Sequence, residues 1–241
     1  LGTSGTATEG TDYTDGSGVV DDITISAGST TGTVSFTPTD DSVYEGNETA
    51  TIAISSVTGE ASESGTQAVT ITITDNESAP TVTLTTSATS IAENAGSSLT
   101  LTATLSGTTY QDVTVGIGTS GSATEGTDYT DGSGVINDIT ISAGSTTGTV
   151  SFTPTDDSIY EDDETATISV SSVSGGDATE SGSQSVSITI AENESAPTVT
   201  LSVSATSIAE NAGSSLTITA TLYGAVDEIV TAGIDTAGTA T

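Results

Sequence analysis

Residues 121–161 read GSATEGTDYTDGSGVINDITISAGSTTGTVSFTPTDDSIYE, and residues 5–45 repeat this stretch with four changes in 41 positions. The two copies lie 116 residues apart, and after one inserted residue near positions 175–177 the spacing becomes 117. A unit of this length can bury a core of its own, unlike the short units of a solenoid. The chain is therefore predicted to be a tandem array of whole domains. Near-identical neighbours favour structural or adhesive work over a single tuned active site.

The ends of the chain fall inside the repeat. Leu1 aligns with Ile117 and Ile234, in the middle of a predicted strand. The predicted divisions are 1–79 (the back part of one unit), 80–196 (a complete unit) and 197–241 (the front part of a third). We expect adjoining sequence in a longer chain to complete the partial units. The alternative is a neighbouring copy that donates its strands, as in strand-addition complexes.

Apolar and polar residues alternate in short runs throughout the complete unit, as in residues 98–105 and 186–190. This period of two indicates half-buried strands, and no segment carries a helical period. Predicted strands include 81–85, 98–105, 113–117, 139–141, 150–152, 166–170 and 186–190. Clusters of Gly, Ser, Asn and Asp separate them. About seven short strands in such a unit predict an all-β fold of tandem immunoglobulin-like antiparallel β-sandwiches.

The charge of the chain is one-sided, with 33 Asp plus Glu, no Lys, Arg or His, and a formal net charge of −33. No salt bridge between side chains is possible, so counter-charge must come from metal ions or salt. This composition excludes nucleic-acid binding through a basic surface and disfavours anionic membranes. No apolar run is long enough to insert into a membrane. Acidity for solubility alone is one alternative, and disorder is another, against which the regular alternation argues.

The acidic residues gather in predicted loops rather than spreading evenly. They concentrate in residues 124–129, 156–164 and 192–194, with Glu93 in a further loop. Carboxylates that converge without a cation repel one another, and Ca²⁺ accepts six to eight oxygen ligands in flexible geometry. Without His or Cys, Zn²⁺ and Cu²⁺ are disfavoured. The acids therefore predict calcium, which would also stabilise a thin core. The alternative is that the Asp residues only form turn hydrogen bonds.

A set of motifs runs through the whole repeat. They are IAENAG (91–96), GSATEGTDY (121–129), Gly144, TVSF (149–152), DDSIYE (156–161) with Glu164, and ITIAENE (188–194). Together these motifs resemble the Calx-β domain, first known from sodium/calcium exchangers and an integrin subunit and common in bacterial surface proteins. The resemblance covers all 241 residues, as one full and two partial domains. It implies a seven-stranded sandwich with a Ca²⁺ cluster at one pole.

The resemblance also implies which residues bind the metal. In the complete unit these are Glu93, Asp128, Asp156, Asp157, Glu161, Glu164, Glu192, Asn193 and Glu194. Their counterparts are Asp12, Asp40, Asp41, Glu45, Glu48, Asp75, Asn76 and Glu77 in the first unit, and Glu210 in the third. One departure concerns the closing acidic run, which reads Asp-Asn-Glu or Glu-Asn-Glu where members that bind several Ca²⁺ ions tend to have consecutive Asp. The number and affinity of the ions are therefore left open.

The linker between units is short and contains a proline, as in Ser195-Ala196-Pro197. Such a linker leaves little freedom, and a metal bound beside it would fix the angle between domains. We expect the neighbouring repeats to be the partners of one another in a head-to-tail, calcium-stiffened fibre or stalk, extracellular or at the cell surface. The alternative is an adhesin module that binds a glycan or protein on another cell or surface.

Catalysis is disfavoured by the same composition. Without His, Cys, Lys or Arg, general-base, thiol and Schiff-base chemistry lose their usual residues. A glycosidase pair of carboxylates is formally available, yet the acids recur identically in the units. Among the tyrosines, Tyr13, Tyr44, Tyr129 and Tyr160 are predicted to be packing or loop anchors. Tyr110 and Tyr223 are predicted to be partly exposed.

Overall fold

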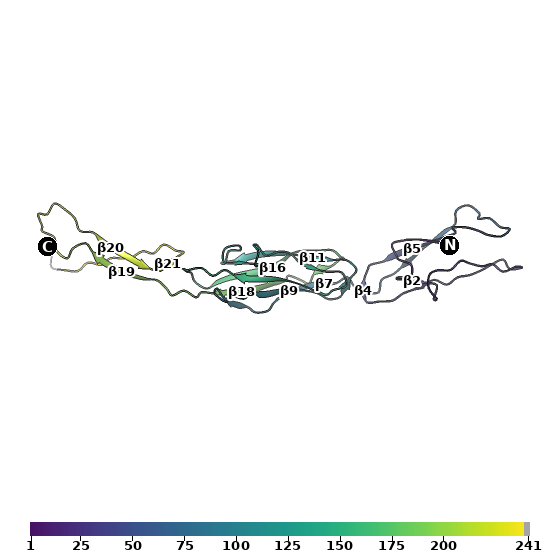
Figure 1. Ribbon diagram of the computed structural model, residues 1–241, viewed down its shortest axis with the longest axis horizontal. Coiled ribbons are helices and arrows are strands. Elements are labelled where there is room, and N and C mark those ends of the chain that lie inside the picture. Colours follow the sequence, from purple (N-terminus) through teal and green to yellow (C-terminus); the bar gives the residue numbers. More distant parts are fainter. Residues whose placement is uncertain (239–241) are drawn as a thin grey trace.

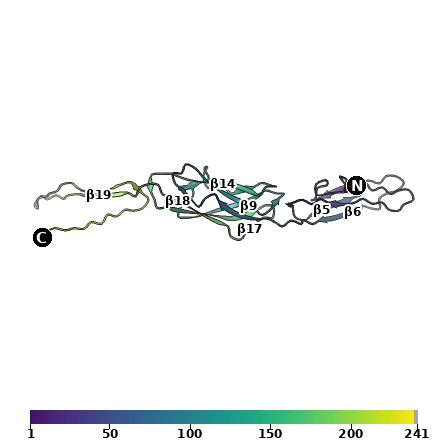
Figure 2. The same cartoon turned by 90° about the horizontal axis from the view of Figure 1, so that it is seen from below.

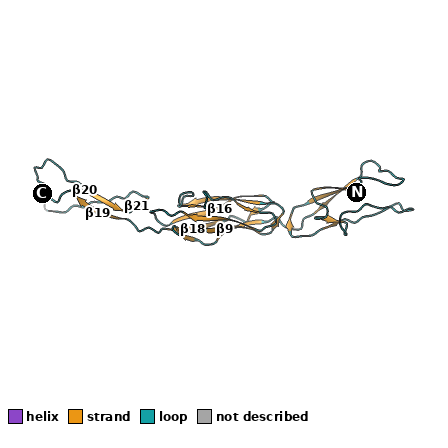
Figure 3. Cartoon of the chain, in the orientation of Figure 1, coloured by secondary structure: helices purple, strands orange, loops and turns teal. Residues whose placement is uncertain are grey.

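The computed structural model describes residues 1–238, which contain strands and no helix (Figure 3). Three units lie in a row along the long axis, and we call residues 1–79, 80–196 and 197–238 the first, central and third units (Figure 1). The strands are β1 (Gly2–Gly5), β2 (Tyr13–Thr14), β3 (Thr37–Pro38), β4 (Val43–Tyr44), β5 (Glu48–Ala53), β6 (Ala68–Ile73), β7 (Thr81–Thr86), β8 (Ser90–Ala92), β9 (Leu99–Leu105), β10 (Thr108–Thr109), β11 (Val113–Gly121), β12 (Tyr129–Thr130), β13 (Ile139–Ile141), β14 (Thr147–Pro154), β15 (Ile159–Tyr160), β16 (Glu164–Ser174), β17 (Thr179–Glu180), β18 (Ser185–Ala191), β19 (Thr198–Val203), β20 (Ile218–Tyr223) and β21 (Ala225–Val226).

The central unit is a sandwich of two five-stranded sheets, with strand orders β13-β11-β16-β18-β8 and β12-β14-β9-β7-β17. Its long ladders are antiparallel, as when β11 pairs with β16 and β14 with β9. All seven strands expected from the alternation are present, which confirms the all-β sandwich. The short edge strands correct the wholly antiparallel arrangement, because β8 pairs with β18 and β17 with β7 in parallel. Neither β8 (Ser90-Ile91-Ala92) nor β17 (Thr179-Glu180) alternates apolar and polar residues as β13 does, so the alternation did not reveal them.

The two sheets of the central unit enclose one continuous apolar core. Tyr129 and Phe152, both 0% exposed, stack at its centre with ring centroids 4.7 Å apart. Inward-facing residues of the long strands surround the pair, including Leu101, Val115 and Ile168. Tyr129 is thus a packing anchor, as predicted. The stack holds the end of the acidic segment 124–129, which leads into β12, against the end of β14, after which the acidic segment 156–164 begins.

The first unit keeps the same plan with a smaller core. A three-stranded sheet, β1-β5-β6, faces the β2–β3 pair, and Tyr13 stacks on Phe36 at 4.7 Å. Ile23 and Ile25 are 43% and 58% exposed, whereas their counterparts in the central unit, Ile139 and Ile141, are buried. Ile139 and Ile141 pair with Val115 and Val113 of β11, positions that in the first unit would precede Leu1. Without that partner strand, the segment of the first unit forms no ladder.

The third unit consists of the antiparallel hairpin β19–β20, followed by β21. The residues of β19 and β20 are all exposed. Tyr223 is 61% exposed and Tyr110 of the central unit is 51% exposed, which confirms the prediction for both residues.

Neighbouring units are joined by two short parallel pairings as well as by the linkers. Strand β4 of the first unit pairs with β10 of the central unit, and β15 of the central unit pairs with β21 of the third. The two pairings occupy equivalent positions of the repeat, since Val43 faces Thr108 and Ile159 faces Ala225. A view turned by 90° shows the same row of units (Figure 2). Each unit therefore touches the next through the same pair of segments.

Tyr44 anchors the first of these junctions. Its hydroxyl donates to Oδ2 of Asp177 at 3.3 Å, and its carbonyl oxygen accepts from the backbone N–H of Tyr110 at 3.3 Å. The Thr108 hydroxyl also donates to the carbonyl oxygen of Ser42 at 2.9 Å. Asp177 follows the residue inserted in the central unit and has a positive φ of 49°. The prediction of Tyr44 as a loop anchor is confirmed, and its partner belongs to the next unit.

Candidate metal centre

Acidic side chains of the central unit converge where several strands end. Strands β8 and β18 run in parallel and pair Ala92 with Ala191, so Glu93 and Glu192 leave the sheet side by side. The backbone N–H of Glu93 extends this ladder by donating to the carbonyl oxygen of Ala191 at 3.0 Å. Parallel pairing thus places two carboxylates together that lie far apart in the sequence.

Glu93, Glu192 and Glu194 form the first cluster, in which each offers a carboxylate oxygen within 4.8 Å of the others. Glu93 is 7% exposed, an unusual degree of burial for a carboxylate. Its Oε1 accepts the backbone N–H of Asp157 at 2.9 Å. Glu194 Oε2 is buried and has no hydrogen-bond partner. A buried oxygen without a donor is costly unless a cation or another donor reaches it.

Asp128, Glu161 and Glu164 form the second cluster, with the same 4.8 Å limit between their carboxylate oxygens. Asp128 precedes β12, Glu161 follows β15 and Glu164 begins β16. The loop before β12 is held by Asp128 itself, whose Oδ2 accepts the backbone N–H of Thr124 at 2.6 Å. A single concave site lined by Glu93, Asp128, Asp157, Glu161, Glu164 and Glu192 connects the two clusters.

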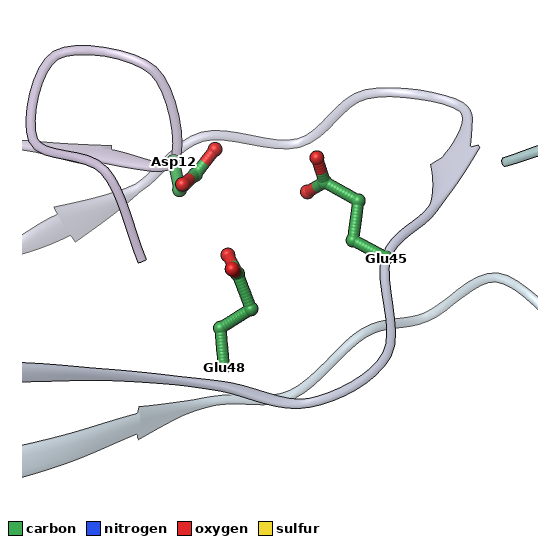
Figure 4. Close-up of side chains that lie close together, drawn as sticks. All are labelled: Asp12, Glu45 and Glu48. Atoms are coloured by element: carbon green, nitrogen blue, oxygen red, sulfur yellow. The ribbon is translucent and has the colours of Figure 1, made fainter. Parts of the chain in front are cut away.

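The first unit repeats the second cluster with Asp12, Glu45 and Glu48. In the close-up their three carboxylates point toward one another (Figure 4). The counterpart of the loop bond is also present, since Oδ2 of Asp12 accepts the backbone N–H of Thr8 at 2.5 Å. Independent formation of the same cluster in two units shows that the repeated sequence determines this geometry locally.

The pKa values reflect the crowding of negative charge. Burial, followed by the charge of Asp128 and a hydrogen bond with it, raises the pKa of Glu164 to about 7. The closeness of its carboxylate to that of Glu192, followed by burial, raises the pKa of Glu194 to about 6. Burial also raises the pKa of Glu93, Glu45 and Glu48. The raised pKa values show that ionisation of these groups is opposed by burial and by neighbouring negative charge, and a bound cation would favour the ionised forms.

Glu192 shows the opposite balance. Burial acts to raise its pKa, but the backbone N–H groups of Glu194, Glu161 and Asn193 donate to its carboxylate, and the pKa is lowered. Asp75 of the first unit behaves in the same way, since its Oδ2 accepts the N–H groups of Glu45 at 2.7 Å and Gly46 at 2.6 Å. These two residues are therefore fixed anions around which the acidic loops are folded.

Turn hydrogen bonds, the alternative reading of the Asp-Asp-Ser loop, are present at one residue of each loop. Oδ1 of Asp157 accepts the N–H of Ile159 at 2.7 Å, and Oδ1 of Asp41 accepts the N–H of Val43 at 2.8 Å. These bonds shape the turn that leads into β15 and β4. Both Asp residues also line the acidic sites of their units.

The structure brings together most of the residues expected to bind metal. Nine belong to the three clusters: Asp12, Glu45, Glu48, Glu93, Asp128, Glu161, Glu164, Glu192 and Glu194. Five more line the two sites: Asp157, Asp41, Asp75, Asn76 and Glu77. Four are exposed and belong neither to these clusters nor to the lining: Asp40, Asp156, Asn193 and Glu210. The metal-binding role of all eighteen remains a prediction.

Two acidic residues of the site escaped the sequence reasoning. Asp162 lines the site, and Oδ1 of Asp163 accepts the backbone N–H of Glu192 at 3.0 Å. Both lie in residues 156–164, so the high density of acidic residues in that run could have identified them. Which acids of such a run face inward depends on the turn, and the motif alone does not state it.

The donor set suits calcium. The clusters offer oxygen atoms only, in groups of three carboxylates, with a buried oxygen of Glu194 lacking a donor. Hard, flexible oxygen coordination of this kind is what Ca²⁺ takes in proteins, whereas Zn²⁺ and Cu²⁺ favour imidazole or thiolate. The residues present therefore fit a calcium ion.

Comparison with known proteins agrees with this geometry. A search of curated proteins found none that matches the chain. The family model described as Calx-beta domain matches twice, over residues 2–77 and 75–194. The two matches together span most of the 241 residues, and they follow one another as the repeat does. The chain therefore belongs to the Calx-beta domain family.

Proposed function

We propose that this chain is a structural repeat segment of a calcium-stiffened extracellular or cell-surface fibre or stalk. Calx-beta domains bind calcium and are β-sandwich modules of extracellular type. The family is structural and regulatory rather than catalytic. Among the described residues, no helix has the length and apolarity needed to cross a membrane.

One observation supports this proposal most strongly. The loop that carries the acids expected to bind metal is also the segment that contacts the next unit. Glu45 directly follows β4, which pairs with the central unit, and Glu161 directly follows β15, which pairs with the third unit. Each of these two residues is bonded directly to the last residue of the strand that pairs with the next unit. A movement of its backbone would therefore also move that strand.

The cation would supply positive charge where the chain has none. Asp128, Glu161 and Glu164 would hold it in the second cluster, and Glu93, Glu192 and Glu194 in the first. With their charges balanced, the carboxylates no longer push the acidic loop away from the sandwich. The loop then keeps β15 in register with the next unit, and the short linker limits the remaining movement.

Calorimetry and thermal unfolding of the full chain test the proposal. Calcium at 100 times its Kd is expected to raise the free energy of unfolding by about 2.7 kcal/mol. In small-angle X-ray scattering, chelation is expected to increase bending between units. Glu164→Gln should weaken binding, and Glu60→Gln, which makes the same change at an exposed position of the first unit outside the clusters and their linings, should leave it unchanged. Absence of calcium binding, or equal stiffness with and without chelator, would contradict the proposal.

A further inference from the structure

The two junctions share their pairing but differ at the next position. In the first junction Tyr44 faces Thr109, and the residue that follows is Tyr110. In the second junction Tyr160 faces Val226, and the residue that follows is Asp227. Equivalent positions of the repeat thus carry an aromatic residue at one junction and an acidic residue at the other.

The register of β15 and β21 gives Glu161 and Asp227 equivalent positions, because each directly follows the last pair, Tyr160 with Val226. Asp227 is exposed and lies outside the group of carboxylates that Asp128, Glu161 and Glu164 form within 4.8 Å of one another. The central unit contains the same arrangement within itself. Strands β8 and β18 are parallel, and the residues after their last pair, Glu93 and Glu192, share one cluster.

The charge distribution agrees with this placement. Burial contributes most to the raised pKa of Glu161 and Glu164, and Asp227 is among the charged residues that add a smaller effect. In the first unit, the leading charged neighbours of Glu45 and Glu48 all belong to that unit. The negative field of the second cluster therefore includes a contribution from across the junction, and that of the first unit's cluster is local.

We propose that Asp227 of the third unit is a ligand for the cation held by Asp128, Glu161 and Glu164, so that one ion bridges two repeats at this junction. At the first junction Tyr110 occupies the equivalent position and offers no carboxylate, so the ion of the Asp12, Glu45 and Glu48 cluster is held by one unit alone. The inference rests on the proposed calcium binding. It adds that junctions of this chain are of two kinds, distinguished by one residue.

The coordination chemistry leaves room for such a ligand. Three carboxylates supply fewer oxygens than the six to eight that Ca²⁺ takes, unless all bind through both oxygens. Asp227 is exposed, so its carboxylate is free of packing constraints. A fourth carboxylate would increase the negative charge around the ion, and ligand charge is one of the factors that set calcium affinity.

Two substitutions in the full chain test the proposal from opposite sides. Asp227→Asn should weaken one class of calcium sites by roughly tenfold in calorimetry, since ligand charge sets the affinity. Glu228→Gln is the matched control, because it removes the same charge one residue further along. Tyr110→Asp should strengthen binding at the first unit's cluster by a similar factor.

A distance measurement separates bridging from simple attraction. The chain contains no Cys, so one introduced cysteine in the central unit and one in the third unit give a unique labelled pair. Calcium should narrow the distribution of distances between the labels in the unaltered chain and in Glu228→Gln, but not in Asp227→Asn.

The outcomes also separate this inference from the proposed function. Calcium binding that is equally affected by Asp227→Asn and Glu228→Gln, or by neither, overturns the bridging role and leaves calcium binding in place. An unchanged affinity in Tyr110→Asp does the same. A chain that binds no calcium at all overturns both proposals.

Discussion

Glu93 Oε1 accepts the backbone N–H of Asp157 at 2.9 Å, and this bond joins two sheets. Glu93 follows β8, at the edge of one sheet, and Asp157 lies in the loop that leaves β14, in the other. The carboxylate that belongs to the first cluster therefore also fixes the acidic loop of the second.

Substitution of Glu93 is expected to separate these two roles. Glu93→Gln retains an oxygen acceptor but removes a buried charge, so calcium binding should weaken while the metal-free fold is retained. Glu93→Ala leaves the N–H of Asp157 without its acceptor, and the free energy of unfolding should fall by about 1–3 kcal/mol. Calorimetry and urea unfolding measure the two effects. Equal stability of the Gln and Ala variants would show that the hydrogen bond contributes nothing.

The stability of the metal-free chain should decrease as the pH rises from about 4.5 to 7. The pKa of Glu164 is about 7 in the folded chain and 4.5 in its ordinary state, so the folded state binds more protons in this window. The stabilisation by this proton is complete below 4.5 and is lost as the pH passes 7. Urea unfolding with chelator at several pH values measures it, and Glu164→Gln should flatten the slope.

Calcium should reverse that dependence because protons and the cation compete for the same oxygens. Calorimetry should show proton release on binding below pH 7, and affinity that increases up to that pH. Binding without proton release at pH 6 would contradict the assignment of Glu164 as a ligand.

Truncation of Phe152 should be among the most damaging core substitutions. Phe152 is 0% exposed and stacks on Tyr129, so Phe152→Ala should lower the free energy of unfolding by about 3–5 kcal/mol. Phe36→Ala is the matched control in the first unit, where the counterpart ring is only half-buried. Its cost should be clearly smaller in the same unfolding experiment. Similar losses for both variants would contradict the difference in burial.

Gly121 should tolerate no side chain. Its φ is 129°, and an added Cβ would lie 1.9 Å from the carbonyl oxygen of Thr165. Gly121→Ala should therefore cost at least about 2 kcal/mol, from strain and displacement of β16. Gly126 also has a positive φ, of 84°, but open space around it, so Gly126→Ala should cost about 1 kcal/mol. Equal effects on the melting temperature would exclude the steric explanation.

The hydroxyl of Tyr44 should strengthen the first junction. Tyr44→Phe removes its hydrogen bond to Asp177 of the central unit, so the contact between the two units should weaken. Distances between labels on the first and central units should then spread. Tyr160→Phe provides the control, because the Tyr160 hydroxyl donates within its own unit, to Asp162 at 3.5 Å. A spread at the first junction in the control would point to a general effect of the ring.

The sequence predicts the long strands well because their alternation records which face is buried. Residues 98–105 and 186–190 are examples, and both fall within ladders of the sandwich. The short strands β4, β10, β15 and β21 could not be predicted in this way. Their two residues have no period, and their pairing depends on segments in different units.

The candidate site shows the same division. Acid-rich runs mark the loops, and they predict that carboxylates meet at one end of the sandwich. The parallel register of β8 and β18 places Glu93 with Glu192, whereas Asp128, Glu161 and Glu164 come together from the loop before β12, the loop after β15 and the start of β16. Asp227 lies in no motif of the repeat, since the equivalent residue of the central unit is Tyr110. Only the pairing of β15 with β21 reveals its position.

The unequal ladders have a mechanical consequence. The ladder at each junction contains two residue pairs, whereas the ladder between β11 and β16 inside the sandwich contains eight. Under a pull along the row, we expect the junctions to part first and re-form when the load is released, while the sandwiches stay closed. The array would then lengthen in small, reversible steps, one for each junction that opens.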